Sequence, residues 1–188
     1  MMDNLAYQEE FRDEMLNGKP VLMSPRPAVN HNRVIGNIFH AFMGYLYGKT
    51  CEPFADGTDV FLTEKDRVIP DVMIICKREI IKRNGVHGVP DLIVEVLSPG
   101  TEKKDRGYKK DLYERCGVGE YWIVDTENRS VEVYLLKDQK YVLDEVYQVF
   151  PDYVELSEKE REEYKSEVPV SLYEDFSIPL EVIFRNLF

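Results

Sequence analysis

Three consecutive segments decide the fold of this chain: VIPDVMIIC at 68–76, PDLIVEVLSPGT at 90–101 and DRGYKKDLYERCGVGEYWIVD at 105–125. The first two are short, almost continuous apolar runs, a pattern typical of central strands that are buried on both faces. Each run contains one acid, Asp71 in the first and Glu95 in the second. An unpaired charge is costly to bury. We therefore expect both acids to hold a metal ion or a charged partner.

The spacing of the two acids predicts that they meet. If residues 67–76 and 90–97 pair as antiparallel strands, the intervening loop is centred near Arg83, and counting twelve residues outward reaches Asp71 and Glu95. Directly opposed side chains have Cβ atoms about 4.5–5.5 Å apart, close enough to share one divalent cation. Two bare carboxylates at that distance would repel, and one would take up a proton. A slip of one residue would put them on opposite faces.

Hard oxygen ligands without a nearby His or Cys set favour magnesium or manganese over zinc. Hydrolysis of a phosphodiester also needs a cation beside the attacking water. The helix expected at 101–116 offers Lys109, which lies one turn from Asp105 and can pair with it. Taken alone, Lys109 could equally be a surface lysine. Asp91 is four residues from Glu95, roughly 13 Å along a strand, so a turn-capping or salt-bridging role suits it better.

The remaining pattern predicts an α/β fold with a mixed central sheet. A long amphipathic helix is expected at about 28–48, with Asn30 as its N-cap and Gly48 at its end. Tyr121 and Trp122 are expected in the core. The other expected elements are a leading helix at 6–16, an Asn17-Gly18 turn, strands at 20–23, 52–62, 119–125, 130–136 and 140–147, and an Asp138–Gln139 turn.

Composition indicates one folded domain, residues 1–188, with a net charge of −11. Residues 151–188 contain 10 Asp and Glu against 4 Lys and Arg and form an acidic C-terminal arm. This acidity weighs against nucleic-acid binding, which rests on a basic surface. The arm ends in the apolar run VIFRNLF at 182–188, which needs cover, so we expect a homodimer.

No apolar run reaches 18 residues and the N-terminus is acidic, so neither a membrane span nor a secretory signal is expected, and we expect a cytoplasmic protein. The three cysteines, Cys51, Cys76 and Cys116, are far apart and show no CxxC spacing. That spacing argues against a zinc site and a disulfide framework. We therefore expect reduced thiols in the core.

The pattern PDV…PDLIVEVLSP…D-x3-K-x3-Y-x3-GV-x-EYWIVD over residues 70–125 resembles the Uma family, a branch of the PD-(D/E)xK restriction-endonuclease-like superfamily. The segment LNGKPVLMSP at 16–25, followed by a helix that begins near His31, is also similar to that family. The likeness covers roughly residues 10–150. It implies a restriction-endonuclease-like core there, with a mixed central β-sheet flanked by α-helices.

The resemblance also implies roles for individual residues. Asp71 and Glu95 match the family's acids and would bind the metal, Mg or Mn, together with the backbone carbonyl of Val96. The chain departs from the usual E-x-K pattern because Leu97 stands two residues after Glu95. The lysine role would then pass to Lys109.

Two further residues, His31 and Ser98, could lie at the edge of the site, and His31 matches a histidine of the family. His31 could be a group at the site edge, a helix cap or a core histidine. Ser98 could orient Glu95 or cap the next element. Both assignments stay open at this point.

The leading hypothesis is a metal-dependent nuclease that hydrolyses DNA phosphodiester bonds, with Asp71, Glu95 and Lys109 as its catalytic set. The alternative is a catalytically silent nuclease-fold module used for binding or assembly. A phosphate cradle for a nucleotide at SPGTEKKDRGYKK is a weaker hypothesis, because the segment has no Walker-type spacing. No organic cofactor is expected.

Overall fold

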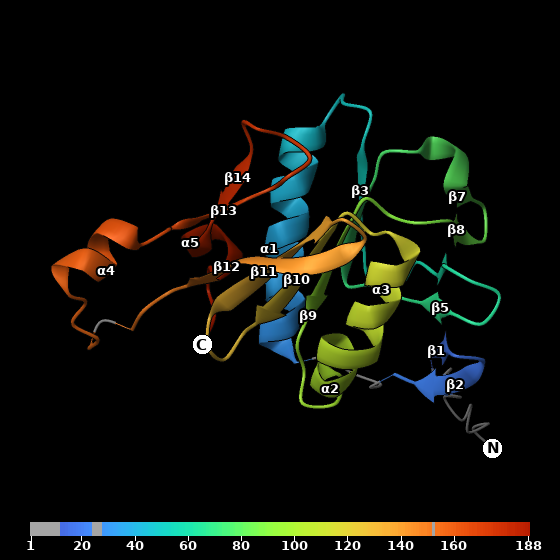
Figure 1. Cartoon of the computed structure of the whole chain (residues 1–188), viewed down its shortest axis with the longest axis horizontal. Coiled ribbons are helices and arrows are strands. Elements are labelled where there is room, and N and C mark those ends of the chain that lie inside the picture. The colour runs from blue at the N-terminus through green and yellow to red at the C-terminus, as the bar shows by residue number, and fades with distance from the viewer. Residues whose placement is uncertain (1–11, 24–27, 152) are drawn as a thin grey trace, which may run out of the picture.

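The computed structural model describes residues 12–23, 28–151 and 153–188. Within that part of the chain, a six-stranded sheet forms the centre, in the order β12-β11-β10-β9-β6-β3 (Figure 1). Strands β9 and β10 are parallel and the other neighbours are antiparallel, so the sheet is mixed as expected. Its strands are β3 (Glu52–Ala55), β6 (Val72–Ile75), β9 (Leu92–Val96), β10 (Glu120–Asp125), β11 (Ser130–Lys137) and β12 (Lys140–Gln148).

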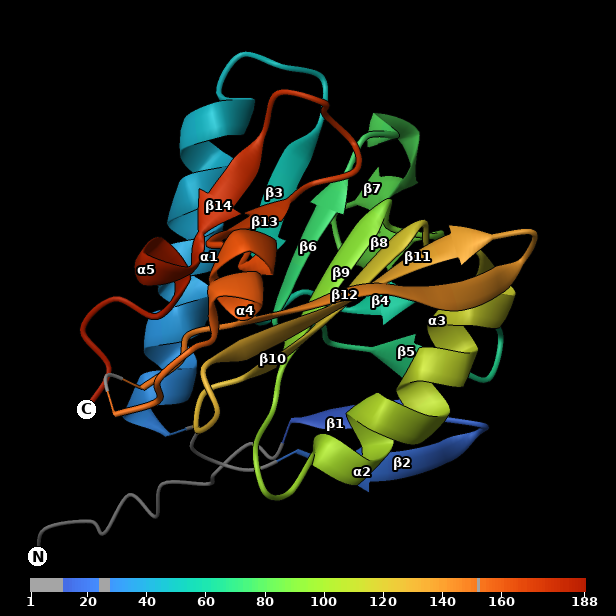
Figure 2. The ribbon, with the colours of Figure 1, turned by 60° about the vertical axis from the view of Figure 1, so that its left-hand side comes forward.

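Helices cover both faces of this sheet, which confirms the predicted mixed α/β architecture. Helix α1 (Val29–Leu46) lies on one face, and the segment α2 (Glu102–Lys104), η2 (Asp105–Lys109) and α3 (Lys110–Cys116) lies on the other (Figure 2). Strand β9 supplies Val94 to the α1 side and Ile93 to the α3 side, as a strand buried on both faces does. Tyr121 and Trp122 are fully buried, as predicted.

The predicted register between the two acid-bearing segments is confirmed. Strands β6 and β9 are antiparallel neighbours, and Val72 pairs with Val94. Continued by one residue, this register puts Asp71 opposite Glu95. Because side chains alternate along a strand, both acids share the face that packs toward α3.

A second six-stranded sheet, in the order β2-β1-β5-β4-β8-β7, covers the α3 side. The leading helix expected at 6–16 is wrong where it can be checked: Asp13–Leu16 is a strand, and residues 6–11 lie outside the described residues. Glu14 and Leu16 are buried at a period of two, the strand period. The Asn17-Gly18 turn and the following strand are confirmed. The sheet contains β1 (Asp13–Leu16), β2 (Lys19–Leu22), β4 (Val60–Phe61), β5 (Arg67–Val68), β7 (Ile81–Lys82) and β8 (Gly85–His87), with the 3₁₀ turn η1 (Arg78–Ile80) before β7.

Two expected strands are each divided between the sheets. The 52–62 segment forms β3 and β4, with Gly57 between them at φ 102°. The 67–76 segment forms β5 and β6, which Pro70 separates because proline has no N–H for a ladder. The predicted Asn30 cap is also wrong: Ala28 is the N-cap of α1, and Asn30 Nδ2 donates to the Phe188 carbonyl (2.7 Å).

The C-terminal region returns to the core. Elements α4 (Glu158–Glu163), β13 (Glu167–Pro169), β14 (Ser177–Pro179) and α5 (Leu180–Ile183) follow the central sheet. Ile178 and Ile183 are buried in the core beneath α1, and Asn37 Nδ2 of α1 donates to the Ile183 carbonyl (3.0 Å). Four of the five apolar side chains in the run at 182–188 are thus buried or half-buried within the same chain, while Phe188 is 81% exposed. The need for cover therefore no longer supports a homodimer.

The expectation of three reduced thiols is wrong for two of the cysteines. Cys51 and Cys76 form a disulfide, while Cys116 is free and half-buried. Glu52 of β3 pairs with Ile75 of β6, so the same register brings Cys51 opposite Cys76. Sequence spacing does not reveal such a contact between strands. In the described residues, no helix is long and apolar enough to cross a membrane.

Candidate metal centre

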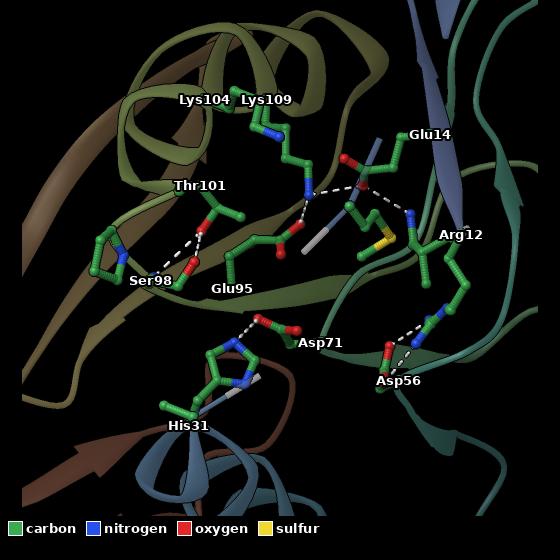
Figure 3. Close-up of a pocket in the computed structure, with 15 residues that line it drawn as sticks. Arg12, Glu14, His31, Asp56, Asp71, Glu95, Ser98, Thr101, Lys104 and Lys109 are labelled. Atoms are coloured by element: carbon green, nitrogen blue, oxygen red, sulfur yellow. Dashed lines mark hydrogen bonds and ion pairs between the residues drawn. The ribbon is translucent and has the colours of Figure 1, made fainter. Parts of the chain in front are cut away.

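A cavity of about 340 Å³ opens where β6 begins and β9 ends. The predicted residues Asp71, Glu95, Lys109, His31 and Ser98 all line it (Figure 3). They come from the residue before β6, from β9 and the turn after it, from the start of α1 and from the η2 turn. The structure thus brings together side chains that the sequence separates by up to 78 residues. Arg12, Glu14, Asp56, Thr101 and Lys104 also line the cavity.

Asp71 is held on one of its two oxygens. Its Oδ2 accepts a hydrogen bond from the Val96 backbone N–H (2.7 Å) and lies 3.4 Å from His31 Nε2. No hydrogen bond from the described residues reaches Oδ1. The chain therefore fixes the carboxylate and leaves one oxygen for another ligand.

Glu95 is held in the same one-sided way. Its Oε1 accepts hydrogen bonds from Lys109 Nζ (3.0 Å) and from the Tyr113 hydroxyl (2.6 Å). Oε2 receives no hydrogen bond from the described part of the chain. Figure 3 shows the Glu95 and Asp71 carboxylates extending toward the same space.

Lys109 lies above Glu95 in a set of three acids. Its Nζ is 2.8 Å from Glu14 Oε1, 3.0 Å from Glu95 Oε1 and 3.7 Å from Asp105 Oδ1. The predicted Asp105–Lys109 pairing is therefore present as a long contact. The lysine is 3% exposed, so it is not the surface lysine that the sequence left open.

The cluster around Lys109 contains more carboxyl groups than amino groups. Burial raises the pKa of Glu95 well above its usual range; Lys109 opposes this, while Asp105, Asp71 and Glu14 raise it further. Burial also raises the pKa of Asp105. Burial lowers the pKa of Lys109, but Glu95, Glu14 and Asp105 together raise it well above its ordinary value. The lysine stays charged and contacts three carboxyl groups, so the raised pKa values of Glu95 and Asp105 mean that a proton or a further cation would stabilise the cluster.

His31 and Ser98 lie at the edge of the cavity. Burial lowers the pKa of His31, but the Asp71 carboxylate and the Val96 carbonyl raise it to a value above the ordinary one. The His31 ring thus faces Asp71. Ser98 Oγ lies 3.1 Å from Thr101 Oγ1, and Thr101 Oγ1 also accepts a hydrogen bond from the Ser98 backbone N–H. Ser98 is therefore part of the turn before α2.

The residues fit a hard divalent cation. Asp71 and Glu95 each present one free carboxylate oxygen, and a cation beside them would oppose the repulsion among the neighbouring carboxyl groups. No group of three or more His, Cys, Asp and Glu side chains in the described residues is arranged to hold a metal. Magnesium commonly binds one or two carboxylates and completes its shell with other oxygens, such as water and substrate phosphate. The Val96 carbonyl could supply a further oxygen, and this role stays a prediction.

Sequence reasoning missed Glu14 and Tyr113, which both contact the cluster. In the segment DEML, Glu14 stands two residues before the apolar Leu16. On a strand, residues two apart share a face, so this spacing predicts that Glu14 faces inward. Tyr113 stands four residues after Lys109 and so shares its helix face. Asp91 does not line the cavity; its Oδ2 accepts from the Cys76 N–H (2.7 Å), beside the neighbouring strand, in place of the predicted turn cap or salt bridge.

Fold and site together define a restriction-endonuclease-like α/β protein with a cavity at the end of its central sheet that both acidic and basic side chains line. The chain belongs to the Uma2 family, described as "Putative restriction endonuclease", whose profile matches residues 2–168. One relative is "Uncharacterized protein slr1290" of Synechocystis sp. (strain ATCC 27184 / PCC 6803 / Kazusa). It is 29% identical over 138 residues, which cover 71% of this chain and 72% of that protein.

A similar solved structure is a "putative nuclease belonging to DUF820" from Anabaena variabilis ATCC 29413. It superposes with a TM-score of 0.69 and 19% identity, and the match covers 92% of this chain and 89% of that chain. At this identity the likeness establishes the shared fold.

Proposed function

We propose that this chain is a nuclease that hydrolyses DNA phosphodiester bonds with the help of magnesium or manganese. The observation that supports this best is the arrangement of Asp71 and Glu95. Each has one oxygen fixed by the chain and one free oxygen, and both line the same cavity. The family membership of the chain supports the same class of reaction.

In this proposal, Asp71 and Glu95 are the metal ligands, with the Val96 carbonyl as a third oxygen. When bound, a divalent cation would neutralise charge on the phosphate and lower the pKa of a water molecule. The chain's own part is to hold the two carboxylates in place through Val96 N–H, Lys109 and Tyr113.

Lys109 has a different role in the proposal. An ammonium cannot coordinate a cation, so Lys109 would hold the attacking water and stabilise negative charge on the phosphate. Its position next to Glu95 Oε1 puts it beside the proposed ligands without occupying the free Oε2. Asp71 would keep the His31 ring at the cavity edge, where it could contact the substrate.

The test is cleavage of plasmid, single-stranded and branched DNA in magnesium or manganese. Asp71→Asn and Glu95→Gln should lower the rate on the order of a thousand-fold and abolish metal binding, because a metal contributes several kcal/mol to such reactions. Lys109→Ala should lower the rate about 100-fold or more and leave metal binding intact. Lys110→Ala is the matched control, since Lys110 lies over the Tyr134 ring, outside the cavity.

The outcomes separate the two hypotheses. If the wild type cleaves none of these substrates with either metal, the silent binding or assembly module becomes the better account. Cleavage that survives Lys109→Ala at full rate would refute the lysine assignment alone.

The homodimer remains a separate proposal, because similar nucleases often pair to cut both strands of a duplex. Light scattering at micromolar concentration should give twice the chain mass, and a monomer would refute it.

A further inference from the structure

Lys109 is surrounded by carboxylates from three elements, which we call the Lys109 cage: Glu14 of β1, Glu95 of β9 and Asp105 of η2. All three acids and the lysine are at most 4% exposed. Because breaking a buried ion pair is costly, such a cage restricts where the ammonium can lie. The question is which member of the cage decides the position of Lys109.

Glu95 and Asp105 are poorly suited to that task. Glu95 is a proposed metal ligand, so its charge would be shared with a cation. Asp105 contacts Lys109 only at 3.7 Å, and its Oδ1 has no hydrogen-bond partner in the described residues. Neither acid holds the ammonium independently of the site.

Glu14 makes the shortest contact in the cage. Its Oε1 lies 2.8 Å from Lys109 Nζ and also accepts a hydrogen bond from the Ile69 N–H (3.0 Å). Ile69 stands two residues before Asp71. One carboxylate oxygen therefore joins the lysine to the segment that leads into the first proposed ligand.

The helix backbone fits the same arrangement. Asp105–Lys109 is a π-helical turn, with α2 before it and α3 after it. A π-turn adds a residue to the helical repeat and shifts the direction of the side chains beyond it, and such turns are frequent at functional sites. Here the turn ends at Lys109, whose side chain extends toward Glu14 and Glu95 (Figure 3).

We propose that Glu14 is a positioning residue, which holds the Lys109 ammonium between Glu95 and the Ile69–Asp71 segment. Glu14 acts through Lys109 and does not bind the metal. This inference rests on the proposed function only for the role of Lys109 in cleavage. The cage itself can be tested without metal or substrate.

The first test is Glu14→Gln, with Asp13→Asn as the matched control. Glutamine keeps the shape of the side chain and an oxygen that can accept from Ile69 N–H, but it removes the charge. Asp13 is the preceding residue of β1, pairs with Arg67 and lies outside the cavity. Glu14→Gln should lower kcat about 10- to 100-fold and leave KM and manganese affinity within about two-fold, while Asp13→Asn should leave all three unchanged. Loss of manganese binding in Glu14→Gln would show that Glu14 is a ligand and overturn the proposal.

The second test measures metal-free thermal unfolding in a double-mutant cycle with Lys109→Met. In the Lys109→Met background, Glu14→Gln only relieves repulsion among the acids, so Tm should rise. In the wild type the same change also breaks the ion pair between Glu14 and Lys109. The change in Tm caused by Glu14→Gln should therefore be about 3 °C or more lower in the wild type than in the Lys109→Met background, which is equivalent to a coupling of about 1 kcal/mol between the two residues. Equal shifts in the two backgrounds would overturn the proposal.

If Lys109→Met does not fold, the ¹H–¹⁵N NMR signal of the Lys109 ammonium tests whether Glu14 holds it. A buried, ion-paired ammonium should exchange slowly enough to be seen in the wild type and in Asp13→Asn. It should shift or disappear in Glu14→Gln, and an unchanged signal would overturn the proposal. A wild type that cleaves no DNA would refute the proposed function, and the cycle and this signal would still decide the role of Glu14.

Discussion

Glu95 and Glu120 are both buried carboxylates on neighbouring parallel strands, β9 and β10, yet the chain treats them differently. Glu120 accepts on both oxygens: Oε1 from the Trp122 indole N–H (2.6 Å), and Oε2 from the Ser171 N–H (2.9 Å) and hydroxyl (2.6 Å). Glu95 accepts both of its hydrogen bonds on Oε1, and its Oε2 accepts none from the described residues. The fold satisfies Glu120 and leaves Glu95 incomplete.

Their charge environments differ in the same direction. Neutral donors surround Glu120, whereas Glu95 shares one lysine with Glu14 and Asp105 and lies near the Asp71 carboxylate. Burial of an acid is therefore not by itself a sign of function. The combination of a free carboxylate oxygen with several neighbouring carboxyl groups indicates a ligand site.

The largest expected effect on stability is the loss of Lys109. In Lys109→Met the cage acids lose their cation, and breaking a buried ion pair from one side costs about 3–5 kcal/mol. Metal-free urea unfolding measures this cost, with Lys110→Met as the control that should change the free energy of unfolding little. A Lys109→Met variant as stable as the control would contradict the cage.

A smaller effect is expected at Glu120. Glu120→Ala leaves the Trp122 and Ser171 donors without an acceptor, which costs about 1–3 kcal/mol of stability. Because Ser171 belongs to the C-terminal region, proteolysis of residues 167–188 should become faster. Manganese affinity should not change; a loss of affinity would remove the distinction between the two carboxylates.

The smallest effect is a pH dependence at Glu120. Burial raises the pKa of Glu120, and the bonds from Ser171 and Trp122 only partly oppose this. The pKa of a Glu side chain in the unfolded chain is about 4.3, and the pKa of Glu120 in the folded protein is higher. Such a group stabilises the folded state at pH values below the unfolded pKa, and this stabilisation is lost as the pH rises through the folded-state pKa. The Tm advantage of the wild type over Glu120→Gln should thus shrink as the pH rises from about 4. An advantage that grows with pH would contradict this sign.

Much of the central sheet and the Asp71–Glu95 pairing could be predicted from the sequence. Continuous apolar runs mark the central strands. Asp71 and Glu95 are each twelve residues from Arg83, the centre of the intervening loop, and this equal spacing predicts the register in which the two acids are opposite. Asp71, Glu95 and Lys109 could be named because their local patterns are unusual for buried segments and match a family motif.

Other features depend on contacts that local patterns do not contain. Glu14 reaches Lys109 across 95 residues of sequence, and its acidic surroundings favoured a helix. The Cys51–Cys76 disulfide follows from the β3–β6 register, which spacing alone does not reveal. The donors that satisfy Glu120 include Ser171, 51 residues further along the chain. Each of these was settled by tertiary packing.

The most direct test of metal binding by Asp71 and Glu95 is a titration of the metal-free protein with manganese, in which calorimetry measures the heat of binding. We expect manganese to bind to the wild type and to Glu120→Gln, and not to Asp71→Asn or Glu95→Gln. The two glutamate variants make the same chemical change on neighbouring strands, so they differ only in which carboxylate is lost. Binding that survives both Asp71→Asn and Glu95→Gln, or that disappears equally in Glu120→Gln, would contradict the account.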